Sequence, residues 1–226
     1  MRTTLATILP WHSNTASKEI GMTRISRILI LLIALSVLVL SSCMNGDPVK
    51  EDISELITKA TLTFTPAAGT SASVIEVTAT DPDGRGTEPI NVNGEIKLVK
   101  GITYTLTVEI LNELANPATD GYNISDEVLK EGDEHQFYFA WTGNVFSSPG
   151  GDGNMDSRND EINYKDSDVN NQPIGLTTEW TATSTAITGT NTFHIVLKHQ
   201  PELKSATSTF DDGETDMDLT FPISVN

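Results

Sequence analysis

The sequence predicts an all-β fold, an antiparallel immunoglobulin-like β-sandwich of about eight strands. Apolar and polar residues alternate with a period of two in several short segments. Threonine, which favours strands, is abundant in these segments, and turn-forming clusters such as DPDGRG and DDGETD separate them. Helical patterns are nearly absent: only residues 125–130 could form a short helix, with Ser125 as its N-cap. A partly closed barrel is the alternative architecture.

The first segments of the chain have the features of a secretion signal. Arg24 and Arg27 precede an apolar run at 28–40, which is shorter than the roughly 20 residues that a membrane-spanning helix needs. Such a run is typical of a cleaved signal peptide, and we predict one at 22–42. Residues 1–21 are then an upstream extension produced by a mis-assigned start.

The signal ends in Leu40-Ser41-Ser42-Cys43, which resembles the lipobox of bacterial lipoproteins. The resemblance implies that cleavage occurs before Cys43, that its sulfur is lipidated, and that the lipid anchors the protein to a membrane. Several acyl chains, each at about 0.8 kcal/mol per buried CH₂, hold such an anchor firmly. Cys43 is the only cysteine, so an internal disulfide framework and a cysteine-cluster zinc site are excluded.

The remaining chain divides into an acidic tether at 43–56 and a β-sandwich domain at 57–226. The clearest strand is 102–113, in which every second residue from Tyr104 to Ile110 is apolar. The strands that we expect, in chain order, are 60–65, 72–80, 95–100, 102–113, 135–142, 176–182, 192–199 and 217–225.

The last expected strand contains Pro222. Proline has no N–H to donate to a neighbouring strand. We therefore expect this strand at the edge of a sheet, or with its proline facing outward at a bulge.

A long acidic connection, 143–173, exceeds the length of an ordinary loop. Two triplets in it match the first three ligand positions of a calcium loop, and they consist of Asp152, Asn154 and Asp156, and of Asp166, Asp168 and Asn170. Both lack the glycine and glutamate that an EF-hand has at its sixth and twelfth positions. A looser calcium site within 152–170 is one hypothesis, and a solvated acidic loop is the other.

Two histidines are expected at the same end of the sandwich. His135 begins one predicted strand and His199 ends another, and both share the parity of the inward apolar residues. If these strands are antiparallel neighbours, the two imidazoles lie together, and the turn at 211–216 could add Glu214 or Asp216. Two histidines and a carboxylate can bind a divalent transition metal. The alternative is two partly buried histidines that form hydrogen bonds with nearby backbone.

Charge and motif content exclude several function classes. The chain has 14 Lys+Arg against 31 Asp+Glu and a net charge of -17, which is the wrong sign for binding a phosphate backbone, so no nucleic-acid partner is expected. It has no Gly-x-Ser-x-Gly, no glycine-rich phosphate loop and no His-Glu-x-x-His. We therefore do not expect an enzyme, although a carboxylate pair could serve a glycosidase.

Four segments resemble a set of short, uncharacterised lipoproteins of the Bacteroidota. They are DEHQF at 133–137, NQPIGL at 171–176, LKHQP at 197–201 and GETD at 213–216, and the resemblance covers most of 43–226. It implies the envelope of a Gram-negative bacterium, with an outer-membrane lipoprotein that faces the periplasm or the medium. The label "type 1 periplasmic binding fold" given to some of these proteins implies an α/β fold, whereas this sequence lacks the alternating helices of such folds.

The sequence therefore predicts a lipid-anchored envelope protein that acts as a non-catalytic binding or structural module. Its partners are the membrane, through Cys43, and a protein or glycan ligand. The first alternative is a metal-binding lipoprotein that uses His135 and His199, or the acidic loop 152–170, to bind calcium or a divalent transition metal. The second alternative is a small secreted hydrolase.

Overall fold

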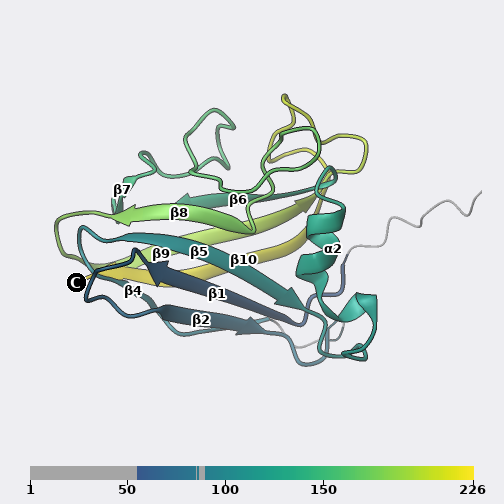
Figure 1. The fold of residues 1–226 in the computed structure, drawn as a ribbon, viewed down its shortest axis with the longest axis horizontal. Helices are drawn as coiled ribbons and strands as arrows, with labels where there is room; N and C mark the ends of the chain where they lie inside the picture. The colour runs from purple at the N-terminus through teal and green to yellow at the C-terminus, as the bar shows by residue number, and fades with distance from the viewer. Residues whose placement is uncertain (1–54, 85, 87–89) are drawn as a thin grey trace, which may run out of the picture. The chain divides into compact units, whose positions relative to one another are not determined.

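The computed structural model describes residues 55–84, 86 and 90–226, all within the compact unit Asp52–Asn226. These residues form ten strands in two sheets (Figure 1), which confirms the all-β sandwich. The immunoglobulin-like topology stays a prediction. The extension 1–21, the signal peptide 22–42, Cys43 and most of the tether lie outside the described residues. Among the residues that are described, no helix has the length and apolar character needed to cross a membrane.

The larger sheet has six strands and the smaller has four. In spatial order, the larger sheet contains β3 (Asn91–Asn93), β2 (Ile75–Thr80), β1 (Lys59–Pro66), β5 (Thr103–Leu111), β8 (Thr177–Ala182) and β7 (Phe146–Ser148). The smaller sheet contains β4 (Ile96–Leu98), β10 (Glu214–Val225), β9 (Ile187–His199) and β6 (His135–Trp141). All pairings are antiparallel except the parallel pair β4–β10.

The two sheets face each other across one hydrophobic core. Phe64 of β1 meets Phe193 of β9 edge to face at 5.9 Å between ring centroids, and Trp180 of β8 meets Phe139 of β6 at 5.3 Å. Each such aromatic pair contributes about 0.5–1.5 kcal/mol beyond the burial of its area. The inward faces are therefore the ones that the period-two alternation predicts.

Every predicted strand is present, and the differences are local. The two additional strands, β3 and β7, have only three residues each, which is too short for an alternating pattern to be recognised. β9 begins at Ile187, so residues 188–191 are not the turn that their sequence TGTN suggests. Residues 188–190 are exposed and Asn191 is half-buried, and they belong to the strand because β10 continues beside them.

The prediction that the last strand is an edge strand is wrong, because β10 lies between β4 and β9. Pro222 is exposed and lies next to a register shift between Ile223 and Val225, which fits the alternative of an outward proline at a bulge. Pairing with β4 begins only at Ile223. The ladder on that side therefore starts after the residue that lacks an N–H.

The short helix α2 (Ile124–Lys130) follows the 3-10 turn η1 (Asp120–Tyr122) and lies near the end of β5 (Figure 1). Its N-cap residue is Asn123, so the prediction of Ser125 as the cap is wrong. The Ser125 hydroxyl instead accepts a hydrogen bond from the Ile110 N–H of β5 at 2.7 Å. A contact distant in sequence thus replaces the local cap.

The long connection 143–173 covers the outer edge of β6. The Phe137 N–H donates to the Ile174 carbonyl at 2.7 Å, and the Trp141 N–H donates to the Asp152 carbonyl at 2.8 Å. Between them, the Phe139 carbonyl accepts from the Asn154 N–H at 2.9 Å. The backbone of this edge strand is therefore paired with the loop, which manages the exposed groups that an edge strand otherwise presents.

Candidate metal centre

Strands β6 and β9 bring His135 and His199 together. His135 is the first residue of β6 and pairs in register with His199, the last residue of β9. Their rings stack with centroids 4.5 Å apart and planes 5° from parallel. Both side chains are buried, so the structure places the two imidazoles at one end of the sandwich, as strand parity predicts.

A β-bulge in β10 adds the third member of the cluster. Thr215 pairs with Lys198 and Met217 pairs with Leu197, so Asp216 is an extra residue in the ladder. Bulges redirect side chains and are common next to functional sites. The Asp216 side chain is fully buried beside His135, whereas Glu214 is exposed. Of the two carboxylates that the sequence offered, only Asp216 joins the histidines.

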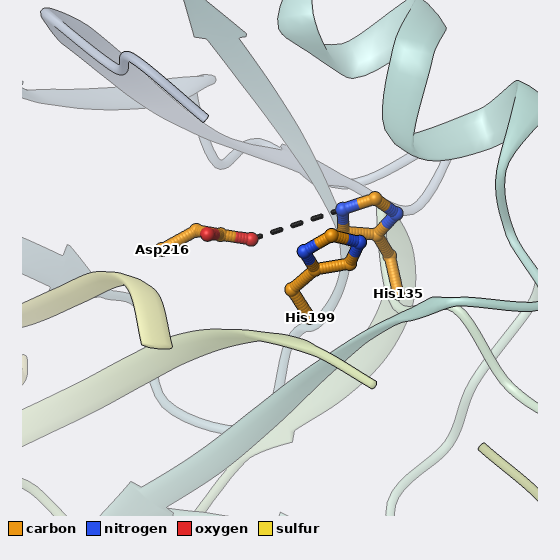
Figure 2. Close-up of side chains that lie close together, drawn as sticks. All are labelled: His135, His199 and Asp216. Carbon is orange, nitrogen blue, oxygen red and sulfur yellow. Dashed lines mark ion pairs between the residues drawn. The ribbon is translucent and has the colours of Figure 1, made fainter. Parts of the chain in front are cut away.

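The separations within this cluster suit the ligands of one ion. One donor atom each from His135, His199 and Asp216 lie within 4.8 Å of one another, and His135 Nε2 is 3.7 Å from Asp216 Oδ2 (Figure 2). Tetrahedral zinc with bonds of about 2.0–2.1 Å holds its ligand atoms about 3.3 Å apart. Small side-chain rotations would therefore bring the three donors to ligand distance.

Hydrogen bonds assign the proton positions of both rings. His135 Nδ1 is 3.1 Å from the Glu131 carbonyl oxygen. A carbonyl only accepts, so Nδ1 carries a hydrogen. In the neutral ring the lone pair is then on Nε2, the nitrogen that faces Asp216. His199 Nε2 is 3.4 Å from Glu134 Oε2, and the same reasoning leaves Nδ1 as the acceptor atom of His199. In Figure 2 each ring turns one nitrogen toward Asp216.

This arrangement is the one that metal-binding histidines commonly have. Such a histidine usually donates its second N–H to a carboxylate or a backbone carbonyl, which fixes the tautomer and makes the other nitrogen a better ligand. In addition, the buried Asp216 carboxylate requires a compensating positive charge. A protonated imidazole or a bound cation can supply that charge.

Three further carboxylates lie close to one another, and one of them, Glu55, interacts electrostatically with Asp216 and His199. The carboxylates of Glu55, Glu127 and Glu131 have oxygens within 4.8 Å of one another. Burial, followed by the charges of Glu127 and Asp216, raises the pKa of Glu55 to about 7, and His199 acts in the opposite direction. No sequence motif indicates these three residues as a group, although the spacing of Glu127 and Glu131 places those two on one helical face. The negative potential that they create favours a cation.

The first predicted calcium triplet is only partly brought together. Asp152 and Asp156 lie near Asp160, and all three are exposed. Asn154 is instead buried, and its side-chain oxygen accepts from the Phe139 N–H at 3.0 Å. Its amide group also donates to the Tyr164 hydroxyl at 3.0 Å. Asn154 therefore attaches the loop to β6, and the exposed acidic group that remains is no stronger as a site than any acidic surface cluster.

The second triplet is engaged with the chain itself. Asp166 accepts from the N–H groups of Gly175 at 2.8 Å and Thr177 at 2.9 Å. Asp168 accepts from the Asn170 N–H at 2.8 Å and forms a buried ion pair with Lys204 at 3.1 Å. Burial lowers the pKa of Lys204, while Asp168 counteracts this effect. These contacts give Asp166, Asp168 and Asn170 a role in loop structure.

A groove with a volume of about 850 Å³ lies beside α2, η1 and β5. Four of the residues that line it carry carboxylates, and they are Glu109, Asp120, Asp126 and Glu127. The described lining does not include His135, His199 or Asp216. The hydrolase alternative stays a prediction.

No protein-family model, no curated protein and no solved structure matches this chain. The resemblance to lipoproteins of the Bacteroidota therefore stays a prediction. The cluster of His135, His199 and Asp216 is the feature of the described residues that points to a function.

Proposed function

We propose that this protein is an envelope lipoprotein that binds a divalent transition-metal ion through His135, His199 and Asp216. One observation carries the proposal: three donor atoms from three adjacent strands lie within 4.8 Å of one another in a buried position. The hydrogen bonds of both histidines support it, because each ring is oriented by a protein oxygen on its other nitrogen.

The donor set favours a transition metal over calcium. Two imidazole nitrogens and one carboxylate oxygen suit zinc, copper, nickel or iron, whereas calcium requires six to eight oxygens. Zinc with three protein ligands keeps a fourth position for water or another ligand. We therefore propose zinc or a similar ion, with one coordination position open.

The cellular part of the proposal rests on the sequence. A lipid on Cys43 anchors the mature chain, and the outer membrane of a Gram-negative bacterium is the proposed location. The domain acts there as a binding module without catalysis. Mass spectrometry of the mature N-terminal peptide tests this part: a diacylglycerol modification at Cys43 supports it, and an unmodified Cys43 in an uncleaved chain contradicts it.

Metal titration tests the binding site. The purified chain, first stripped of metal with a chelator, is titrated with Zn²⁺ in competition with a chromophoric chelator. We expect His135→Gln, His199→Gln and Asp216→Asn to weaken zinc binding by more than about 100-fold, since removing a residue that only orients a ligand already costs about 10–100-fold.

The surface pair His194 and Asp218, on β9 and β10, provides matched controls. His194→Gln and Asp218→Asn repeat the same chemical changes outside the cluster, and we expect both to leave zinc affinity unchanged. Equal losses in the cluster variants and the controls, or no measurable zinc binding by the unsubstituted protein, would contradict the proposal. A parallel titration with Ca²⁺ is expected to show no competition for the zinc site.

A further inference from the structure

We infer that Glu134 is a positioning residue of this site: it holds His199 in the tautomer that carries its hydrogen on Nε2, so that Nδ1 is the atom offered to the ion. The inference rests on the proposed metal binding and deepens it, because it specifies how the ion is held. His135 would bind through Nε2 and His199 through Nδ1.

The backbone fixes Glu134 next to His199. Glu134 directly precedes His135, and its carbonyl accepts a hydrogen bond from the Gln200 N–H at 2.6 Å. This bond continues the β6–β9 ladder one step beyond the His135–His199 pair. The Glu134 side chain therefore starts from a defined position, from which Oε2 lies 3.4 Å from His199 Nε2.

The direction of this contact makes Glu134 an orienting residue rather than a fourth ligand. In Figure 2 one nitrogen of His199 faces Asp216 and the other lies on the opposite side of the ring. Glu134 contacts Nε2, which leaves Nδ1 as the nitrogen directed at the cluster. A negatively charged acceptor on Nε2–H also increases the electron density at Nδ1 and strengthens it as a ligand.

The two histidines differ in how their orientation can be tested. His135 is oriented by the backbone carbonyl of Glu131, which no side-chain substitution removes. His199 is oriented by a side chain that is 33% exposed, so substitution there should disturb little of the core. Glu134 is therefore the position at which the orienting contact can be removed or restored.

The experiment measures two quantities in the full chain. Nitrogen-15 NMR of the metal-free protein reports the tautomer of each histidine, and competition titration reports the Zn²⁺ affinity. We expect His199 to be protonated on Nε2 in the unsubstituted protein. Glu134→Leu should mix the two tautomers of His199, leave the tautomer of His135 unchanged, and weaken zinc binding by about 10–100-fold.

Two further variants separate orientation from charge. Glu134→Gln keeps an oxygen that accepts from Nε2–H, so we expect it to restore the tautomer and most of the zinc affinity. Glu161→Leu makes the same change as Glu134→Leu at an exposed position in the loop 143–173, and we expect both readouts to stay as in the unsubstituted protein. If Glu134→Leu does not fold, as judged by circular dichroism, Glu134→Ala takes its place.

The inference is overturned if Glu134→Leu leaves the His199 tautomer unchanged, or if Glu134→Gln loses as much zinc affinity as Glu134→Leu. Failure of the proposed function gives a different result. In that case the unsubstituted protein binds no zinc, while the tautomer in the metal-free protein still shows whether Glu134 orients His199.

Discussion

Two histidine–aspartate pairs in the four-stranded sheet combine the same residue types in different surroundings. His194 Nε2 lies 2.7 Å from Asp218 Oδ1, with exposed fractions of 31% and 61%. His135 Nε2 lies 3.7 Å from Asp216 Oδ2, and both side chains are fully buried. The exposed pair is joined by one short hydrogen bond at the protein surface. The buried pair is more widely spaced and has a second imidazole stacked against it.

The difference arises from the backbone. Asp218 pairs with Val196 in a regular part of the β9–β10 ladder, and it faces outward. Asp216 is the extra residue of the bulge, which turns its carboxylate toward the interior. A pair of residue types therefore does not by itself indicate a metal site. Burial, spacing and a second, oriented histidine distinguish the buried pair from the exposed one.

The largest effect that separates the two pairs is stabilisation by zinc. At about 100 times its Kd, a ligand that binds only the folded state raises the free energy of unfolding by about 2.7 kcal/mol. We expect this increase in the unsubstituted protein and in Asp218→Asn, and no increase in Asp216→Asn. Thermal unfolding with and without a chelator measures it, and an equal increase in all three proteins would remove the distinction between the pairs.

A smaller effect should appear in the pH dependence of stability, through the acidic group beside the buried pair. The pKa of Glu55 is raised from 4.5 to about 7. Between these values the folded protein holds more protons on Glu55 than the unfolded chain does, so the free energy of unfolding falls as the pH rises through this window. Because Glu55 is only half-buried, solvent screening limits the change to about 1 kcal/mol.

Glu55→Gln removes this titration. We expect the metal-free variant to lose less stability than the unsubstituted protein between pH 4.5 and 7. Urea unfolding at a series of pH values measures the difference. Superimposable profiles for the two proteins would show that Glu55 does not respond to the buried pair in this way.

The smallest effect is expected at the exposed pair. His194→Gln or Asp218→Asn should change the free energy of unfolding by less than about 1 kcal/mol, because an ion pair in water gains little over its solvated parts. Added salt should reduce even this difference. A loss of several kcal/mol in urea unfolding would mean that the surface pair contributes to the core, and the contrast with Asp216 would then be wrong.

Much of the fold and part of the site could be predicted from the sequence. Period-two alternation locates long strands such as β5, and it fails for β3 and β7 because three residues carry no pattern. Strand parity brings His135 and His199 to one end of the sandwich. It cannot choose between Glu214 and Asp216, since a bulge is a backbone irregularity that alternation does not reveal.

In the acidic loop, by contrast, the sequence suggests a site that the structure does not assemble. Asp166 and Asp168 have the spacing of calcium ligands, but the Asp168 oxygen accepts backbone N–H groups within the loop. The Asp166 oxygens accept those of Gly175 and Thr177, just beyond it. Asn154 has the position of a ligand in the sequence motif, but its buried side chain forms hydrogen bonds with the Phe139 N–H of β6 and with the Tyr164 hydroxyl. In each case the hydrogen-bonding partner lies far along the chain or in a local turn. A motif of alternate residues carries no information about such partners.

The pairing of the loop with β6 has a consequence for encounters between molecules. The Tyr164 hydroxyl donates to the Phe137 carbonyl at 2.6 Å, and burial raises the pKa of Tyr164, so it keeps its proton. Together with the bonds to Asp152, Asn154 and Ile174, this contact occupies backbone groups on the outer edge of β6. A strand from another molecule therefore finds few free backbone groups to pair with there. A protein crowded against copies of itself is thereby protected, on this side, from β-augmentation and from growth into a continuous intermolecular sheet.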